Sequence, residues 1–187
     1  FDKYGPEKCL KELLGSPGNF TASKLKWVRE QEPDVYQKIR HIMLPGDFIA
    51  ARLTRVPQTS QSGLSEAALW NFPEGRLATE LLESMGLDAE LVPEIVPNFG
   101  KQATIHPEVA AELGLNNEVS VTYRAGDQPN NAFSLNVLEP GEIATTAGTS
   151  AVVYSVSDEN VYDKESRINT FLHVNNSEKA RRNGVML

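Results

Sequence analysis

Residues 124–151, RAGDQPNNAFSLNVLEPGEIATTAGTSA, constrain the fold of this chain more than any other segment. The alternating run just before them predicts a β-strand, and Asp127 follows a glycine at the end of that strand. Further along, the small-residue turn TTAGTS lies between two β-rich runs and predicts a hairpin. Strands and helices mixed in this way along the whole chain indicate the α/β class.

The carboxylate and the turn together match the requirements of phosphoryl transfer. A carboxylate at a strand end can accept the proton of an alcohol, and a glycine-containing turn lets backbone N–H groups approach a phosphate closely. The segment therefore predicts a kinase that acts on a small hydroxylated molecule. On the residues alone a second interpretation of Asp127 remains open, in which its side chain only caps the helix that Pro129 favours just behind it.

Composition and charge narrow the classes of partner. The 187 residues are 40% hydrophobic and 23% charged, which is ordinary for a globular protein of one or two domains. The net charge of −7 disfavours nucleic acid and anionic membranes as partners. Cys9 is the single cysteine and allows no intrachain disulfide, and His41, His106 and His173 lie too far apart in sequence to suggest a metal site. With no apolar run of transmembrane length, a cytoplasmic setting is expected.

Apolar periodicity, prolines and glycines place the remaining elements. A short strand that enters a helix is expected at 43–54, and the polar run 55–66, RVPQTSQSGLSE, is expected to be a loop. Helices are expected at residues 7–14, 21–33, 35–42, 77–85, 107–114 and 128–136, and strands at 118–126, 142–148, 149–156 and 168–174.

Several conspicuous side chains are interpreted as structural. Trp27 lies at helical spacing and a place in the core is expected for it, and Lys24 is treated as structural with it. Asp47 precedes an apolar helix and is expected to cap that helix. His173 stands in period-two surroundings, which favour a strand residue over a metal ligand.

Four segments resemble, in order, motifs of the FGGY carbohydrate kinases. SKLKWVREQEP resembles the family's Lys-x-x-Trp helix, and LPGDFIAARLT resembles its Pro-x-Asp-Tyr/Phe helix. AGDQ resembles the segment that holds the catalytic aspartate, and TTAGTSAVV resembles the first phosphate-contacting hairpin of the second domain. Within the family, TYRAGDQPNN, GTSAVVYSV and RINTFLHV are most similar to the xylulokinases. Arg55 departs from the family, which usually has Gly after Leu-Thr, and this departure is expected to alter a loop and not the chemistry.

The resemblance implies the actin-like, ribonuclease-H-like fold, in which two α/β lobes close over a cleft. Residues 1–137 would form the latter part of the N-terminal, sugar-binding domain, and residues 138–187 the truncated start of the C-terminal, nucleotide-binding domain. The implied reaction is phosphorylation of a sugar hydroxyl by ATP with Mg²⁺, which would convert D-xylulose to D-xylulose 5-phosphate. Another substrate of the family, such as a different ketose, gluconate or glycerol, and a non-catalytic binding fragment remain as alternatives.

The resemblance also assigns roles to individual residues. Asp127 would be the general base that accepts the proton of the attacking hydroxyl. Gln128, Asn130 and Asn19 would bind substrate hydroxyls, although Gln128 could also be an exposed helix residue and Asn19 a polar loop residue. The nucleotide phosphates would contact two residues of the hairpin turn, Gly148 and Thr149, which could otherwise form an ordinary turn. No metal ligand is assigned.

Two motifs that the family carries elsewhere are absent from this sequence. The chain holds neither the Asp-x-Gly-Thr motif nor the Gly-rich adenosine site, so residues 1–187 alone are expected to be inactive. The second sheet is expected to be unfinished, with an apolar end near Val185 left unpaired. Unpaired strand edges of this kind would allow two copies to pair as a homodimer.

Overall fold

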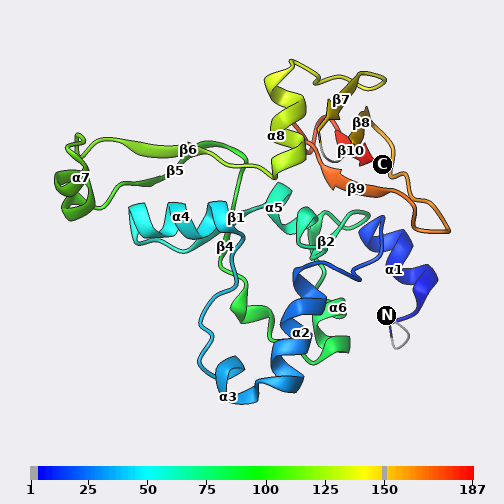
Figure 1. Cartoon of the computed structure of the whole chain (residues 1–187), viewed down its shortest axis with the longest axis horizontal. Helices are drawn as coiled ribbons and strands as arrows, with labels where there is room; N and C mark the ends of the chain where they lie inside the picture. The colour runs from blue at the N-terminus through cyan, green and yellow to red at the C-terminus, as the bar shows by residue number, and fades with distance from the viewer. Residues whose placement is uncertain (1–3, 149–150) are drawn as a thin grey trace.

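The computed structural model describes residues 4–148 and 151–187. Figure 1 shows a helical body, a long two-stranded arm that projects from it, and a four-stranded sheet with one helix beside it. Among the helices of these residues, none is long and apolar enough to cross a membrane.

Proline and glycine set the ends of several helices. The α-helices are α1 (Pro6–Leu13), α2 (Thr21–Gln31), α3 (Pro33–Tyr36), α4 (Pro45–Thr54), α5 (Gln61–Glu66), α6 (Thr79–Met85), α7 (Pro107–Leu113) and α8 (Asp127–Ser134). Proline begins α1, α3, α4 and α7, because its fixed φ suits a helix and its missing N–H would have no partner there. Gly86 and Gly114 end α6 and α7 in the left-handed conformation, at φ of 68° and 67°.

The strands form three small pairs and one larger sheet. The strands are β1 (Gln58–Ser60), β2 (Trp70–Asn71), β3 (Arg76–Leu77), β4 (Glu94–Val96), β5 (Phe99–Thr104), β6 (Ser120–Tyr123), β7 (Ile143–Ala147), β8 (Ala151–Ser157), β9 (Asn169–Leu172) and β10 (Asn183–Met186). β1 and β4 pair in parallel, whereas β2 with β3 and β5 with β6 are antiparallel. The larger sheet is antiparallel in the order β7-β8-β10-β9. A 3₁₀ turn at Ala89–Leu91 precedes β4.

Most predicted elements are confirmed where local signals were strong. The expected helices at 7–14, 77–85, 107–114 and 128–136 correspond to α1, α6, α7 and α8, and the expected hairpin corresponds to β7 and β8. The helix expected at 35–42 is wrong, since only the short α3 forms there. The strand expected before α4 is also wrong, because residues 43 and 44 lie outside any strand.

The polar run 55–66 is a loop only at residues 55–57, and the rest of it corrects the sequence-based expectation. It forms β1 and then α5, whose N-cap Ser60 accepts a hydrogen bond from the Gly63 N–H at 3.1 Å. Most of residues 58–65 are buried although the segment is polar, because its hydroxyls have partners. Ser65 Oγ donates to the Ser62 carbonyl at 2.7 Å and accepts from the Leu172 N–H at 2.9 Å.

The main hydrophobic core lies among α1, α2, α5, α6 and β2. Helix α2 contributes Ala22 and Leu25, which are three residues apart and therefore on one face. Trp27 lies off that face and is 58% exposed, so the prediction of a core tryptophan is wrong at this position. Trp70 of β2, in contrast, is in this core.

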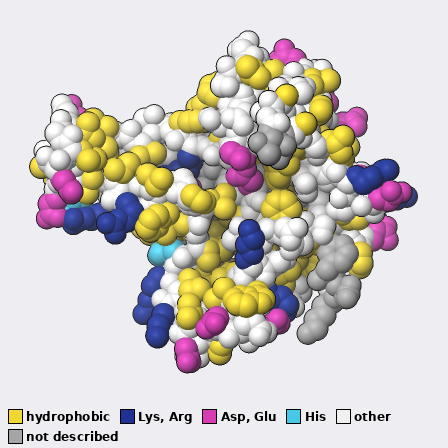
Figure 2. Space-filling view, viewed as in Figure 1, with side chains coloured by type: hydrophobic (Ala, Val, Ile, Leu, Met, Phe, Trp, Pro, Cys, Tyr) yellow, Lys and Arg dark blue, Asp and Glu magenta, His cyan; other side chains and the backbone are white. Residues whose placement is uncertain are grey.

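The arm of β5, β6 and α7 carries apolar side chains on its surface. Leu113, Leu115 and Val119 are exposed at its outer end, and Phe99 is 45% exposed at its base. Figure 2 shows hydrophobic side chains over the arm and the neighbouring α4. Phe99 stacks on Tyr123 with ring centroids 4.9 Å apart, and Phe133 of α8 contacts both rings edge-on or tilted.

The strand β10 lies inside the larger sheet. β10 lies between β8 and β9, and Val185 pairs with Ser155 on one side and with Thr170 on the other. The expectation of an unpaired apolar end near Val185 is therefore wrong. The pairing also explains Gly184, because a Cβ there would lie 1.8 Å from the Tyr154 hydroxyl oxygen.

His173 follows β9 and is fully buried instead of lying within a strand. Its Nε2 is 3.0 Å from the Val137 carbonyl oxygen, so this nitrogen carries the proton and donates. Its Nδ1 then accepts from the Tyr154 hydroxyl at 2.8 Å. Burial lowers the pKa of His173, which keeps the ring neutral.

α8 packs against the larger sheet. Ala132 of this helix shares a small core with Ala144, Tyr154 and Val156. The polypeptide between α8 and β7 is held by the His173 contact with Val137. The division of the chain into domains at 137 and 138 stays a prediction.

Arg55 provides a test of backbone strain. It ends α4 at a φ of 61°, in the left-handed region where a side chain is disfavoured. We expect Arg55→Gly to be more stable than Arg55→Ala by about 1 kcal/mol, because glycine has no Cβ to strain this conformation. Both variants lose the ion pair between Arg55 and Glu108, so comparing them isolates the backbone term. Urea unfolding of the two variants measures the difference, and equal midpoints would contradict the prediction.

Candidate active site

A cleft opens where α4, α5 and the turn before α8 meet. Its volume is about 470 Å³. The residues that line it include Asp47, Gly63, Glu66, Arg124, Asp127 and Asn130. The predicted base therefore lies in a cavity of a size that suits a small ligand.

Asp127 is the first residue of α8, and its carboxyl group does not cap the helix. The N-cap is Gly126, which makes no side-chain capping hydrogen bond. The alternative interpretation of Asp127 as a helix cap is therefore wrong. Its side chain is exposed at the cleft, where a ligand could reach it.

Glu66 lies directly against Asp127. The Asp127 N–H donates to Glu66 Oε1 at 3.2 Å, which brings the two carboxyl groups close together. Burial, followed by the interaction with the Asp127 carboxyl group and its charge, raises the pKa of Glu66 to about 8. Glu66 is therefore protonated at neutral pH.

Arg124 fixes the strand end that leads to Asp127. Its Nη1 donates to Asp47 Oδ1 at 3.0 Å and to the Gln58 carbonyl at 2.6 Å, and its Nε donates to Gln102 Oε1 at 2.8 Å. The Arg124 and Asp47 side chains are only 9% and 6% exposed. Because α4, β1 and β5 supply these partners, the pair locks three elements to the end of β6.

Asp47 does not have the role expected from the sequence. It is the third residue of α4, and no side chain makes a capping hydrogen bond at the start of that helix. Its carboxylate instead accepts from Thr59 Oγ1 at 2.8 Å and pairs with Arg124. The prediction of a cap is wrong because a buried cation draws the carboxylate inward.

The other predicted site residues lie at different places. Asn130 lines the cleft and accepts from the Tyr123 hydroxyl at 2.8 Å. Gln128 is partly buried in the first turn of α8, and Asn19 is exposed in the turn before α2, and neither lines this cleft. Gly148 forms an exposed bend at the end of β7. Thr149 lies outside the described residues, so the structure tests no role for it.

Sequence reasoning missed three residues of the cleft, namely Glu66, Arg124 and Asp47. Arg124 carried a signal, since it is a charged residue at the end of the predicted strand, directly before AGDQ. Glu66 had no such signal, because its segment was interpreted as a loop. Within residues 4–148 and 151–187, no group of three acidic, histidine or cysteine side chains could hold a metal ion. Ligands for Mg²⁺ are therefore not assigned.

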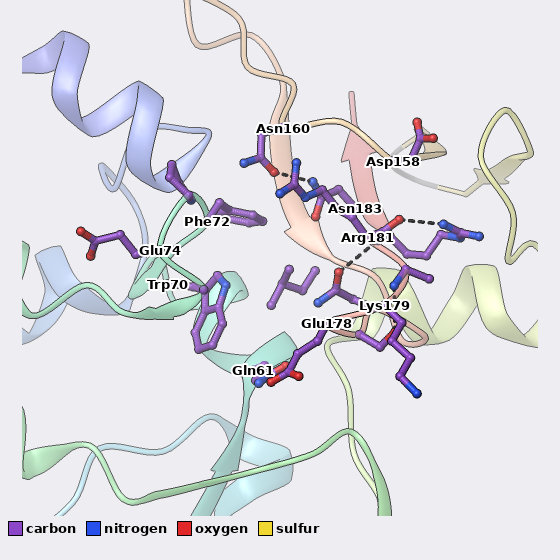
Figure 3. Close-up of a pocket in the computed structure, with 17 residues that line it drawn as sticks. Gln61, Trp70, Phe72, Glu74, Asp158, Asn160, Glu178, Lys179, Arg181 and Asn183 are labelled. Atoms are coloured by element: carbon purple, nitrogen blue, oxygen red, sulfur yellow. Dashed lines mark hydrogen bonds between the residues drawn. The ribbon is translucent and has the colours of Figure 1, made fainter.

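A larger open pocket lies away from these residues. It has a volume of about 670 Å³, and Figure 3 shows Trp70 and Phe72 on one side and Lys179 and Arg181 on the other. None of the predicted site residues lines it. The cleft at Asp127, which combines a carboxyl pair with a buried cation, is the stronger candidate for chemistry.

The buried pair leads to a test of stability. Arg124→Ala or Asp47→Ala leaves a buried charge without its partner, and we expect each to lower the free energy of unfolding by about 3–5 kcal/mol. The double variant should lose much less free energy of unfolding than the sum of the losses in the two single variants. Chemical denaturation of all four proteins measures this coupling.

The exposed pair Glu74 and Arg76 is the matched control, in which water screens the charges and little coupling is expected. Additive losses for Asp47 and Arg124 would contradict the prediction.

Comparison with known proteins identifies similar sequences. Residues 9–134 match the N-terminal domain of the FGGY family of carbohydrate kinases. The xylulose kinase of Bacillus subtilis (strain 168) is 27% identical over 154 residues, which are 82% of this chain and 31% of that protein. The chain spans about a third of the length of the curated relatives it matches.

Solved structures show the same fold. The xylulose kinase from Rhodospirillum rubrum superposes with a TM-score of 0.87 at 19% identity, over 97% of this chain and 36% of that one. The Plasmodium falciparum glycerol kinase with ADP gives a TM-score of 0.87 at 18% identity, over 99% of this chain and 38% of that one. The predicted actin-like α/β fold of the sugar kinases, present here in part, is confirmed.

Proposed function

The chain belongs to the FGGY family of carbohydrate kinases, and on that premise we propose that it serves the ATP-dependent phosphorylation of a sugar hydroxyl. The observation that carries the proposal is Asp127, whose carboxyl group faces a cleft at the start of α8 and is free of any capping role. D-xylulose is the proposed substrate and D-xylulose 5-phosphate the product. The sequence similarity to enzymes named xylulose kinase supports this choice.

In the proposed reaction, Asp127 acts as the general base. Its carboxylate accepts the proton of the attacking sugar hydroxyl while the hydroxyl oxygen bonds to the γ-phosphorus and the bond from that phosphorus to the ADP oxygen breaks. MgATP, when bound, supplies the phosphoryl group. Kinase rates depend mostly on positioning, and the locked strand end at Arg124 supplies rigidity to the base.

The remaining roles extend the proposal to binding. Asn130 lines the cleft beside Asp127, so its amide can bind a substrate hydroxyl. We assign Gln128 and Asn19 to the sugar as well, and Gly148 and Thr149 to the nucleotide phosphates. We place the boundary between the sugar-binding and nucleotide-binding domains at 137 and 138. We also propose that the protein is cytoplasmic and forms a homodimer.

A different sugar is the second candidate. Glycerol kinase and gluconate kinase share the fold at 18% and 16% identity, and this likeness concerns the fold alone. Assay of the complete gene product with D-xylulose, gluconate and glycerol decides between them. Because the chain spans about a third of its relatives, we expect residues 1–187 expressed alone not to phosphorylate sugar. A gene product that binds sugar without turnover would instead support the non-catalytic alternative.

The role of the base has a direct test. We expect Asp127→Asn in the complete gene product to lower kcat by about 10²–10⁴-fold, because the amide cannot accept the proton. Steady-state assay with sugar and MgATP gives the rate, and circular dichroism checks that the variant is folded. A kcat near that of the wild type would show that Asp127 is not the base.

The hairpin turn has a separate test. We expect Gly148→Val to weaken MgATP binding by about tenfold or more while leaving sugar binding nearly unchanged, since a side chain would block the approach of the backbone to phosphate. Isothermal titration with each ligand separately measures both affinities. Equal losses for the two ligands in a folded variant would indicate a purely structural turn.

A further inference from the structure

We propose that Glu66 is a positioning residue, whose carboxyl group holds the Asp127 carboxylate in the orientation that accepts the sugar proton. The inference rests on the proposed function, in which Asp127 is the base. Glu66 is the last residue of α5 and lines the same cleft as Asp127. The AGDQ motif around Asp127 does not include Glu66.

The first argument is the close approach of Glu66 to the turn before α8. Glu66 Oε1 accepts from the Asp127 N–H at 3.2 Å. A Cβ built on Gly126 would lie 2.5 Å from Glu66 Cδ and 2.5–2.6 Å from its two oxygens. Gly126 has a φ of −66°, which any residue can adopt. A side chain at position 126 would therefore displace the Glu66 carboxyl group, whereas the backbone conformation alone does not require glycine.

The second argument is the anchoring of α5. Ser62 Oγ accepts from the Gly126 N–H at 3.2 Å and lies 3.2 Å from the Leu172 carbonyl, to which it donates. The same short helix thus holds the Gly126 backbone through Ser62 and the Asp127 backbone through Glu66. Glu66 lies on α5, and α5 is fixed both to the turn at Gly126 and to β9. The position of the Glu66 carboxyl group is therefore defined.

The third argument is the balance of charge around Glu66. The charged or titratable groups that face it are Asp127 on α8, Asp47 on α4, Arg124 after β6 and Tyr154 on β8. The Arg124 guanidinium is already paired with Asp47, and burial raises the pKa of Tyr154, which stays neutral. An ionised Glu66 would therefore add a second uncompensated negative charge beside Asp127. Sharing one proton between the two carboxyl groups removes that repulsion.

The backbone contact suggests where the shared proton belongs in this proposal. Because Glu66 Oε1 accepts the Asp127 N–H, we assign the proton to Oε2, from which it is donated to one Asp127 oxygen. The second Asp127 oxygen stays available for the sugar hydroxyl. No proton leaves Glu66 during the reaction. When pH rises past the Glu66 pKa of about 8, this hydrogen bond is lost and the two carboxylates repel each other.

The test compares Glu66→Gln with Glu66→Ala in the complete gene product. A glutamine presents a carbonyl to the Asp127 N–H and an N–H to its carboxylate, so it reproduces the protonated glutamate and cannot ionise. For the wild type we expect kcat/KM to fall as pH rises above about 8, since kcat/KM reports the free enzyme. Glu66→Gln should keep activity at pH 7 and lose this alkaline fall. Glu66→Ala should lower kcat by about 10–100-fold at every pH, because the base is misplaced.

Controls separate this inference from the function itself. Glu112→Gln, on the exposed surface of α7, should keep the wild-type profile. ADP release is measured directly by chromatography, so that no coupling enzyme limits the pH range. A wild type that phosphorylates none of the sugars overturns the proposed function. An active wild type with an alkaline fall that Glu66→Gln retains, or a fully active Glu66→Ala, overturns only the role of Glu66.

A second measurement does not depend on turnover. In protein labelled with ¹³C at the glutamate side-chain carboxyl carbon, the resonance missing from Glu66→Gln belongs to Glu66. We expect its shift to titrate with a midpoint near pH 8. A midpoint in the ordinary range of glutamate, near 4.3, would overturn the inference whatever the activity.

Discussion

The buried ion pair of Arg124 and Asp47 is the interaction on which the geometry of the cleft depends. Removing two charges from water is costly, and the cost is offset only when the groups have good partners. Here the Arg124 side chain also donates to Gln58 and Gln102, and Asp47 also accepts from Thr59. These bonds join α4, β1 and β5 to the end of β6. The pair therefore specifies where the chain turns into α8, and with it where Asp127 lies.

Helix α5 is a second constraint, made from side chains that usually face water. Ser62 and Ser65 are buried in it, and their hydroxyls bind backbone groups of the turn at Gly126 and of β9 at Leu172. A buried hydroxyl without a partner would be unfavourable, so these bonds fix the helix at a single position. One short polar helix thereby connects the helical body, the cleft and the larger sheet.

The sequence predicted the elements that depend on local signals. Proline and glycine located α7, and alternation located β7 and β8, because these signals act within a few residues. The resemblance around AGDQ located Asp127, and the structure places Asn130 beside it in the cleft. The segment 55–66 and the partners of Asp47 could not be predicted, because distant segments satisfy their polar groups. Trp27 was misjudged for a different reason, because its helix buries a different face.

The position of β10 has a consequence for how the sheet is made during synthesis. β10 comes last of the four strands in sequence, yet it lies between β8 and β9. When β7, β8 and β9 have left the ribosome, only the β7–β8 hairpin has its sequence neighbour as a partner, and β9 has none until residues 183–186 emerge. This sheet therefore forms late, when β10 inserts between the edges of β8 and β9. Until then those strand edges can pair with another chain. The nearest such chains are other copies of this protein that are being translated from the same messenger RNA.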